Sequence, residues 1–193
     1  MPDFYLFAGV NGAGKSTLYS NELLEDNKLS QSYRINADEI ARAHNWDWRK
    51  PGTDIKAMKI ELLEIKASIT DGKSFNLETT LSGSSKYFSN LIENAKNNGF
   101  TVHLYYVGVS SVYTALDRIK SRVEKGGHGV DTSLVFKRYP TSLKNLYKLI
   151  NEFDEVKIYD NSSKFSRIYW KDKTTILDKS SNMPDWFKPA INE

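Results

Sequence analysis

The glycine-rich segment at residues 9–16 constrains the fold of this chain more than any other part of its sequence. Its letters, GVNGAGKS, fit the phosphate-binding pattern G-x-x-x-x-G-K-[ST]. An apolar run at residues 4–8 precedes the segment, and a helix-like stretch at residues 15–25 follows it. A loop between a strand and a helix can turn successive backbone N–H groups toward one phosphate group. The sequence therefore predicts a nucleotide-phosphate loop at the first strand–helix junction.

The motif also gives a role to its polar side chains. The Lys15 ammonium can bridge the β- and γ-phosphates of ATP, and the Ser16 hydroxyl can ligate Mg²⁺. We therefore expect ATP and Mg²⁺ as cofactors. The residues that we expect around the phosphates are Gly9, Asn11, Gly12, Ala13, Gly14, Lys15, Ser16 and Thr17.

Several enzyme classes share such a loop, and two of them fit this sequence poorly. A GTPase normally carries an N-K-x-D motif, whereas Asn27-Lys28 is followed here by Leu-Ser. The letters LSGSS at residues 81–85 superficially suggest an ABC-type ATPase. That stretch lacks the final Gly-Gln, and no strand of four hydrophobic residues ending in Asp-Glu follows it. A small-molecule kinase remains as the leading interpretation.

Strand-like and helix-like segments alternate along most of the chain. Apolar and β-branched runs predict strands at residues 4–8, 33–36, 74–77, 100–107, 156–159, 167–170 and 175–177. Helical spacing predicts helices at residues 15–25, 38–44, 55–70, 86–98, 112–123 and 132–153, the last one interrupted at Pro140. This alternation predicts an α/β protein with a parallel sheet and helices on both faces. In such proteins the ligands bind at the carboxyl ends of the strands.

Composition narrows the remaining classes. The chain has 193 residues, of which 39% are hydrophobic and 26% charged, so we expect one folded domain over residues 1–193. The absence of cysteine excludes disulfides and a thiol nucleophile. No apolar run approaches the roughly 20 residues that span a bilayer, and no secretory signal pattern opens the sequence. We therefore expect a cytoplasmic protein without a membrane partner.

Charge is distributed unevenly along the sequence. The 27 Lys and Arg against 24 Asp and Glu give a net charge of +3, too small to indicate a nucleic-acid partner. Arg118 and Arg122 share one helix face before the flexible letters EKGGHG, and Arg138 follows on the next helix. Arginines on a mobile lid can neutralise a phosphoryl group during transfer. We expect a small helical lid at about residues 118–140, with a solvated helix face as the alternative.

Two carboxylates follow predicted strands that end at the same edge as the phosphate loop. Asp38 could take the proton of an acceptor hydroxyl, or it could merely cap the helix that begins there. Glu78 ends the third predicted strand, beside Thr79 and Thr80. A buried carboxylate needs a ligand hydroxyl, a cation or a backbone donor as its partner. We expect Glu78 to help bind the acceptor, with a solvated strand end as the alternative.

Four segments, in this order, resemble the short bacterial branch of the zeta toxin family. They are GVNGAGKSTL from residue 9, INADEI from residue 35, ETTLSG from residue 78 and RVEKGGHGV from residue 122, with Arg138 downstream. The resemblance extends from residue 4 to about residue 161. It implies a P-loop NTPase fold similar to adenylate kinase, and a kinase that transfers the γ-phosphoryl group of ATP to UDP-N-acetylglucosamine or a related UDP-sugar. It also implies a toxin that a small protein antitoxin neutralises.

The resemblance further assigns roles to single residues. It makes Asp38 the base on the sugar hydroxyl and Lys15 the phosphate clamp. By the same resemblance, Arg122 and Arg138 stabilise the transferred phosphoryl group, although Arg118 could take one of these roles. The expected substrate-binding residues are Glu78, Thr79, Thr80, Arg118 and His128, and Asn161 is expected near the adenine.

Two other functions are compatible with these residues. A kinase for another hydroxyl acceptor, such as a nucleoside, a dinucleotide or an antibiotic, would use the same machinery. An ATP-gated binding module would instead control a partner without any transfer. Asp38 together with the lid arginines argues against the module, because binding alone does not require them.

Overall fold

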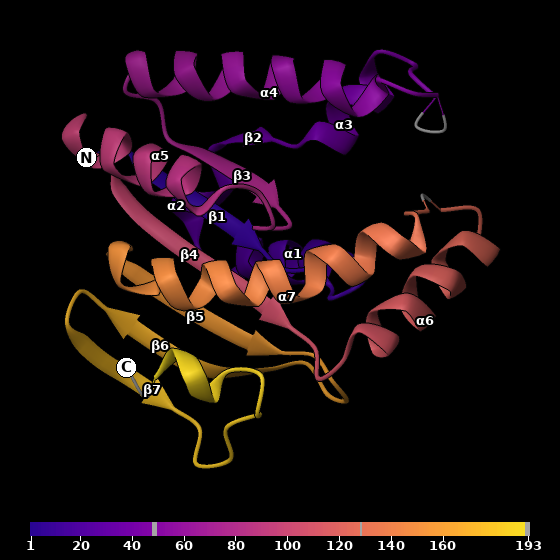
Figure 1. The fold of residues 1–193 in the computed structure, drawn as a ribbon. Coiled ribbons are helices and arrows are strands. Elements are labelled where there is room, and N and C mark those ends of the chain that lie inside the picture. Colours follow the sequence, from indigo (N-terminus) through magenta and orange to yellow (C-terminus); the bar gives the residue numbers. More distant parts are fainter. Residues whose placement is uncertain (48–49, 128, 192–193) are drawn as a thin grey trace.

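A single sheet of seven strands organises the computed structural model, which describes residues 1–47, 50–127 and 129–191 (Figure 1). The strand order is β2-β3-β1-β4-β5-β6-β7. Neighbours from β2 to β5 pair in parallel, whereas the β5–β6 and β6–β7 pairs are antiparallel, so the sheet is mixed. The strands are β1 (Asp3–Ala8), β2 (Tyr33–Ile35), β3 (Phe75–Thr79), β4 (Thr101–Gly108), β5 (Glu155–Asp160), β6 (Ser166–Asp172) and β7 (Thr175–Lys179).

Helices cover both faces of this sheet, as the sequence predicts. Helices α4, α5 and α7 pack on the face toward the viewer in Figure 1, and α1, α2 and α6 contribute to the apolar cluster on the opposite face. Helix α3 packs against α4 beyond the edge strand β2. The helices are α1 (Lys15–Glu25), α2 (Asn27–Ser30), α3 (Ala37–Ala43), α4 (Thr53–Thr70), α5 (Ser85–Asn97), α6 (Val112–Glu124) and α7 (Thr132–Leu149), with short 3₁₀ turns η1 (Ile150–Glu152) and η2 (Lys188–Ala190).

Strand β1 shows why the core has two halves. Its side chains alternate between the faces, so Phe4 and Leu6 join the cluster under α4, α5 and α7. Tyr5 and Phe7 join the cluster under α1, α2 and α6. All four are at most 1% exposed, and burying such a side chain contributes about 1.5–3 kcal/mol. A strand this buried on both faces must be central, which places the phosphate loop at the middle of the sheet.

Helix α7 differs from its prediction. We expected an interruption at Pro140, but the helix continues through this residue from Thr132 to Leu149. Pro140 removes only one backbone donor, while buried residues on both sides, including Val135 and Leu146, hold the helix against the molecule. The C-terminal part of the predicted lid, residues 132–140, therefore belongs to a long helix that also packs on the sheet.

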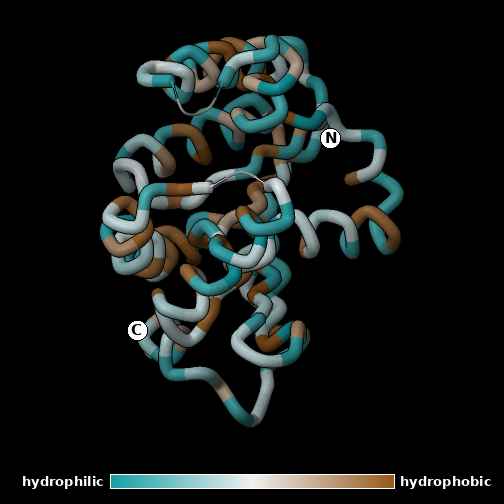
Figure 2. Tube along the Cα trace, turned by 90° about the vertical axis from the view of Figure 1, so that its right-hand side faces the viewer, coloured by the Kyte–Doolittle hydropathy of each residue, from teal (hydrophilic) through white to brown (hydrophobic). Residues whose placement is uncertain are grey.

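Helix α4 carries apolar side chains on its outer surface. Ile55, Met58, Leu62 and Leu63 are each at least 40% exposed. Figure 2 shows apolar and hydrophilic residues mixed along the uppermost part of the trace, where α4 lies. Within the described ranges, no helix combines the length and apolar character needed to cross a membrane.

Candidate functional site

The loop between β1 and α1 has the backbone shape of a phosphate cradle. Gly12 and Gly14 have φ angles of 81° and 107°, in the left-handed region that favours glycine. A Cβ atom at Gly12 would lie 2.3 Å from the backbone oxygen of Ala115, so the loop also needs glycine for space. Gly14 is the N-cap of α1 and provides no side-chain hydrogen bond. The first N–H groups of α1 are therefore free of a side-chain cap and suited to an anion.

Two side chains hold this loop to its surroundings, and a third supports one of them. Asn161 follows β5, and its Nδ2 donates to the backbone oxygen of Ala13 at 2.9 Å. Arg138 on α7 donates from Nη1 to Oδ1 of Asn11 at 3.0 Å. Arg118 on α6 donates from Nη2 to the backbone oxygen of Asn161 at 2.6 Å. The loop is thus bordered by the end of β5 and by helix α7, with α6 next to Asn161.

Lys15 is the buried cation of the site. It is 9% exposed, and its Nζ donates to the backbone oxygen of Gly9 at 2.9 Å. The same Nζ lies 4.0 Å from Oε1 of Glu78, at the end of β3. The Lys15 side chain therefore bends toward the start of its own loop, and Oε1 of Glu78 is the nearby carboxylate oxygen.

The electrostatics of Lys15 show which predicted residues come together. Burial lowers the pKa of the Lys15 ammonium below its usual value, while Glu78 and Asp38 oppose this shift. Arg122 and Arg138 lower the pKa further. These four residues come from β3, α3, α6 and α7, and the charge of each affects the pKa of the same ammonium group.

Asp38 lies in the first turn of α3, but it does not cap this helix. Asn36 is the N-cap, and its Oδ1 accepts from the backbone N–H of Asp38 at 2.9 Å and of Glu39 at 3.2 Å. Asp38 is exposed, and its carboxylate makes no hydrogen bond or ion pair with the residues that the structure describes. Its charge acts on both Lys15 and Arg138. The carboxylate is therefore exposed and open to a ligand.

Glu78 is held by donors from the edge strand. Its Oε2 accepts from Nη2 of Arg34 at 2.8 Å and from Nδ2 of Asn36 at 3.0 Å. The side chain is 14% exposed. Oε1 is the oxygen that faces Lys15. The alternative of a solvated strand end is wrong for Glu78, because two donors bond to this carboxylate and the Lys15 ammonium lies 4.0 Å away.

The two threonines after Glu78 mainly shape the chain there. Thr79 Oγ1 accepts from the backbone N–H of Leu81 at 3.2 Å. Thr80 Oγ1 shares a hydrogen bond with Ser82 Oγ at 2.7 Å. Both threonines are partly exposed, and their roles toward a substrate remain predictions.

The three arginines of the lid segment have different partners. Arg138 contacts the phosphate loop. The positive charge of Arg122 lowers the pKa of the Lys15 ammonium. Arg118 reaches the end of β5 instead, and its Nη1 is buried without a hydrogen-bond partner among the described atoms. His128 lies outside the described residues. A concavity of about 370 Å³ is lined by Arg118, Ser121, Arg122, Lys125 and Gly127.

The sequence did not reveal three residues around this cluster. Arg34 and Asn36 hold Glu78, and no local pattern in residues 33–36 distinguishes them from solvated polar positions. Glu61 on α4 is the third. Burial raises the pKa of its carboxyl to about 7, and the charges of Asp38 and Glu64 add to the shift. Only the packing of α3 on α4 brings these acids together.

The oxygen donors at this edge fit Mg²⁺. Ser16 is exposed in the first turn of α1, on the same edge as Asp38. Mg²⁺ usually keeps several waters and binds one or two protein oxygens together with substrate phosphates. A hydroxyl beside a phosphate loop provides that kind of ligand.

Comparison with known proteins agrees with this geometry. The family described as "Zeta toxin" matches residues 1–174. An uncharacterised protein of Haemophilus influenzae is 37% identical over 133 residues, which are 69% of this chain and 89% of that protein.

Solved structures share the fold at low sequence identity. A structure from the PezAT chromosomal toxin–antitoxin system of Streptococcus pneumoniae has a TM-score of 0.63 at 18% identity, covering 91% of this chain and 74% of that chain. The AvrRxo1-ORF1:-ORF2 structure with ATP has a TM-score of 0.68 at 12% identity, covering 92% of this chain and 60% of that chain. The family match spans nine tenths of the sequence and includes the phosphate loop, Asp38, Glu78 and the lid arginines. This chain therefore belongs to the zeta toxin family.

Proposed function

We propose that this protein is an ATP-dependent kinase that phosphorylates a hydroxyl group of a small molecule. The observation that carries the proposal is an uncapped phosphate loop whose Lys15 lies 4.0 Å from Glu78 and whose Asn11 accepts from Arg138, with the exposed carboxylate of Asp38 at the same edge of the sheet. A site that only binds nucleotide needs the loop and Lys15, but it does not need an open carboxylate on the acceptor side. The membership in the zeta toxin family and the fold of an ATP complex support the same reaction.

The proposed transfer follows from the positions of these groups. The loop amides and Lys15 hold the β- and γ-phosphates, for which Lys15 exchanges its hydrogen bond to Gly9. Asp38 orients the acceptor hydroxyl and takes its proton as the oxygen bonds to the γ-phosphorus. The bond between the γ-phosphorus and the bridging oxygen breaks, and ADP leaves. When bound, Mg²⁺ at Ser16 neutralises phosphate charge.

Arg138 and Arg122 are the cations that we propose to neutralise the negative charge of the transferred phosphoryl group that Lys15 and Mg²⁺ leave uncompensated. Arg138 already contacts the loop through Asn11. Arg118 is occupied by the backbone of Asn161, which suits a role next to the nucleotide base better than one at the γ-phosphate. We therefore assign Arg122 and Arg138 to the phosphoryl group.

The acceptor that we propose is UDP-N-acetylglucosamine or a related UDP-sugar. The family supports this choice. Glu78 and Thr79 end β3, the strand next to β1 and its phosphate loop, and Thr80 follows them; we assign these three residues to the substrate.

The test is a transfer assay with purified protein, ATP, Mg²⁺ and a panel of acceptors that includes UDP-N-acetylglucosamine, nucleosides and aminoglycosides. We expect a phosphorylated UDP-sugar by mass spectrometry. Asp38→Asn should lower kcat about 100- to 10,000-fold while binding of a non-hydrolysable ATP analogue stays close to wild type. Asp71→Asn removes an exposed carboxylate paired with Lys73 and serves as the matched control, with unchanged turnover.

Each alternative predicts a different result. Selective turnover of a non-uridine acceptor would overturn the UDP-sugar as substrate, but it would support the kinase activity. Binding of the analogue without transfer to any acceptor would favour the ATP-gated module. Full activity of Asp38→Asn would remove Asp38 from the mechanism.

A protein antitoxin is the partner that we propose for this chain. The family and the solved toxin–antitoxin system with the same fold support it. Induced expression in a bacterial host should slow growth, and Lys15→Ala should relieve the effect because the phosphate clamp is lost. Equal growth with both proteins at equal expression would contradict the toxin assignment.

A further inference from the structure

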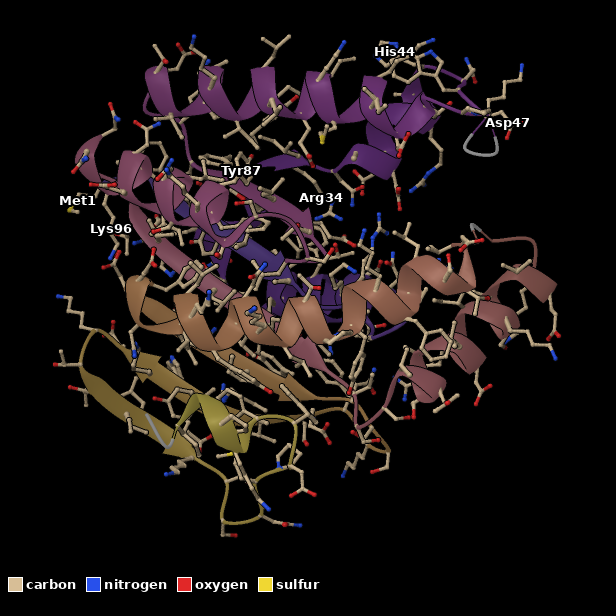
Figure 3. All side chains as sticks on the ribbon, viewed as in Figure 1. Met1, Arg34, His44, Asp47, Tyr87 and Lys96 are labelled. Carbon is tan, nitrogen blue, oxygen red and sulfur yellow. The ribbon has the colours of Figure 1, made fainter. Side chains whose placement is uncertain are left out.

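Arg34 makes an unusual number of contacts for a residue in a short edge strand. Its Nε donates to Glu39 Oε1 at 2.9 Å, its Nη1 to Asn76 Oδ1 at 3.2 Å and its Nη2 to Glu78 Oε2 at 2.8 Å. The guanidinium carbon also lies 3.7 Å from the ring centroid of Tyr19. Figure 3 shows Arg34 below the junction of β2 and α3, between these elements and the central strands. One side chain therefore joins β2, α3, β3 and α1.

These contacts use the features that distinguish arginine from lysine. The planar fork donates to three different acceptors while its face rests on an aromatic ring. Burial alone lowers the pKa of Arg34, but the hydrogen bonds and charges of Glu39 and Glu78 outweigh it and leave the pKa raised. Arg34 is thus a permanent cation between two acids, with only 18% of its side chain exposed.

The two oxygens of Glu78 have different surroundings. Oε2 is occupied by Arg34 and Asn36, whereas Oε1 lies 4.0 Å from Nζ of Lys15. That distance is longer than a charged hydrogen bond, which is about 2.7–2.9 Å. Lys15 donates to Gly9 instead. Arg34 therefore holds Glu78 just short of direct contact with the phosphate-binding lysine.

We propose that Arg34 is a positioning residue, which retains Glu78 on the β2 side of the site and so keeps Lys15 free to bind nucleotide phosphate. The inference rests on the proposed function of Lys15. Without Arg34, the Glu78 carboxylate would lose the guanidinium that binds Oε2 and would pair directly with Lys15. Two opposite charges in a buried site interact strongly, so this pair would compete with the phosphates.

The test measures binding of a non-hydrolysable ATP analogue, with Mg²⁺ and without any acceptor. Arg34→Gln should weaken this binding at least 10-fold. The double variant Arg34→Gln/Glu78→Gln should regain affinity to within about 3-fold of Glu78→Gln alone, because a neutral side chain no longer captures Lys15. The affinity of Arg34→Lys for the analogue should lie between those of wild type and Arg34→Gln. A lysine retains the positive charge but cannot donate to three acceptors in one plane.

Arg42→Gln is the matched control. Arg42 is exposed on α3, and its substitution removes the same charge from the same region without touching Glu78. Its analogue affinity should stay within 2-fold of wild type. Thermal unfolding of every variant accompanies the binding measurements, and Arg34→Lys supplies the comparison if Arg34→Gln does not fold.

The rescue distinguishes positioning from general support of the fold. A purely structural arginine predicts that Glu78→Gln adds to the damage, so a double variant that binds no better than Arg34→Gln overturns the proposal. Wild-type affinity of Arg34→Gln, or of a folded Arg34→Lys where the Gln variant does not fold, also overturns it. The assay measures nucleotide binding without an acceptor. Its result can therefore be interpreted even if the protein does not catalyse the proposed transfer.

Discussion

Gly12 and Gly72 have similar backbones in different surroundings. Their φ angles are 81° and 61°, both in the left-handed region. A Cβ atom at Gly12 would lie 2.3 Å from the backbone oxygen of Ala115, whereas one at Gly72 would meet nothing within 4 Å. The first glycine is therefore required by conformation and by the close approach of α6, and the second by conformation alone.

This difference gives a prediction for two alanine variants. Gly12→Ala should lower the free energy of unfolding by about 2–4 kcal/mol, because backbone strain adds to a clash with main chain. Gly72→Ala should lower it by about 1–2 kcal/mol. Urea unfolding checks both values, and the ATP analogue should bind only the Gly72 variant normally. Equal destabilisation would mean that α6 moves away from the loop without penalty.

Residues of the site differ in how far the sequence could reveal them. The phosphate loop is a local pattern, so its glycines and Lys15 follow directly from the letters. Arg34 has no such pattern, because its partners Asn76 and Glu78 are more than forty positions away. The parallel pairing of Arg34 with Asn76 in β2 and β3 brings them together. A short window of sequence does not indicate which residues of two distant strands will pair.

At the scale of elements, α7 links the core to the candidate lid. Its C-terminal half buries Leu146 and Leu149, and its N-terminal half carries Arg138 to the phosphate loop. Pro140 lies between these halves on an exposed position. Our prediction of a break at this point was wrong because local propensity was outweighed by packing on both sides.

Replacing this proline should strengthen the helix. Pro140→Ala restores a backbone donor and should raise the free energy of unfolding by about 1–3 kcal/mol. Lys144→Ala, at another exposed position of α7, is the control and should change stability by less than about 0.5 kcal/mol. Thermal and urea unfolding measure both. A loss of stability in Pro140→Ala would show that the proline is required for the packing of this helix.

The order and type of most elements follow from sequence periodicity, whereas their ends depend on tertiary context. All seven strands and all helices of more than four residues were predicted near their observed positions. The short helix α2 was not, because one turn carries no periodic signal; Asp26 caps it with its carboxylate. The antiparallel direction of β6 was not predicted either, since strand direction follows from connections rather than composition.

At the scale of the whole molecule, a partly buried histidine joins three strands. His103 on β4 contacts Glu155 on β5 at 2.7 Å and Asp3 on β1 at 3.0 Å. Burial alone lowers the pKa of His103, but the hydrogen bonds to Asp3 and Glu155 outweigh burial, so the pKa lies above its usual value. The folded protein therefore binds this proton more tightly than the unfolded chain.

The sign of the resulting pH dependence follows from this shift. The contribution of His103 to stability is complete below its unfolded pKa of about 6.5 and is lost as pH rises through its higher folded pKa. Urea unfolding between pH 6 and 9 should show a declining free energy in wild type and a flatter profile in His103→Gln. His44→Gln, at an exposed position, should keep the wild-type slope. Identical slopes in all three proteins would exclude His103 as the source.

The outer strand β7 has a consequence for how these molecules behave in concentrated solution. Within the part of the chain that the structure describes, it pairs with β6 alone, and all of its residues are exposed, among them Ile176 and Leu177. Such a margin can act as a template for another polypeptide and start aggregation. Asp178 and Lys179 place opposite charges at its end, which discourages an uncharged segment from adding on. The tendency to aggregate is thus concentrated at the margin opposite β2 and Arg34.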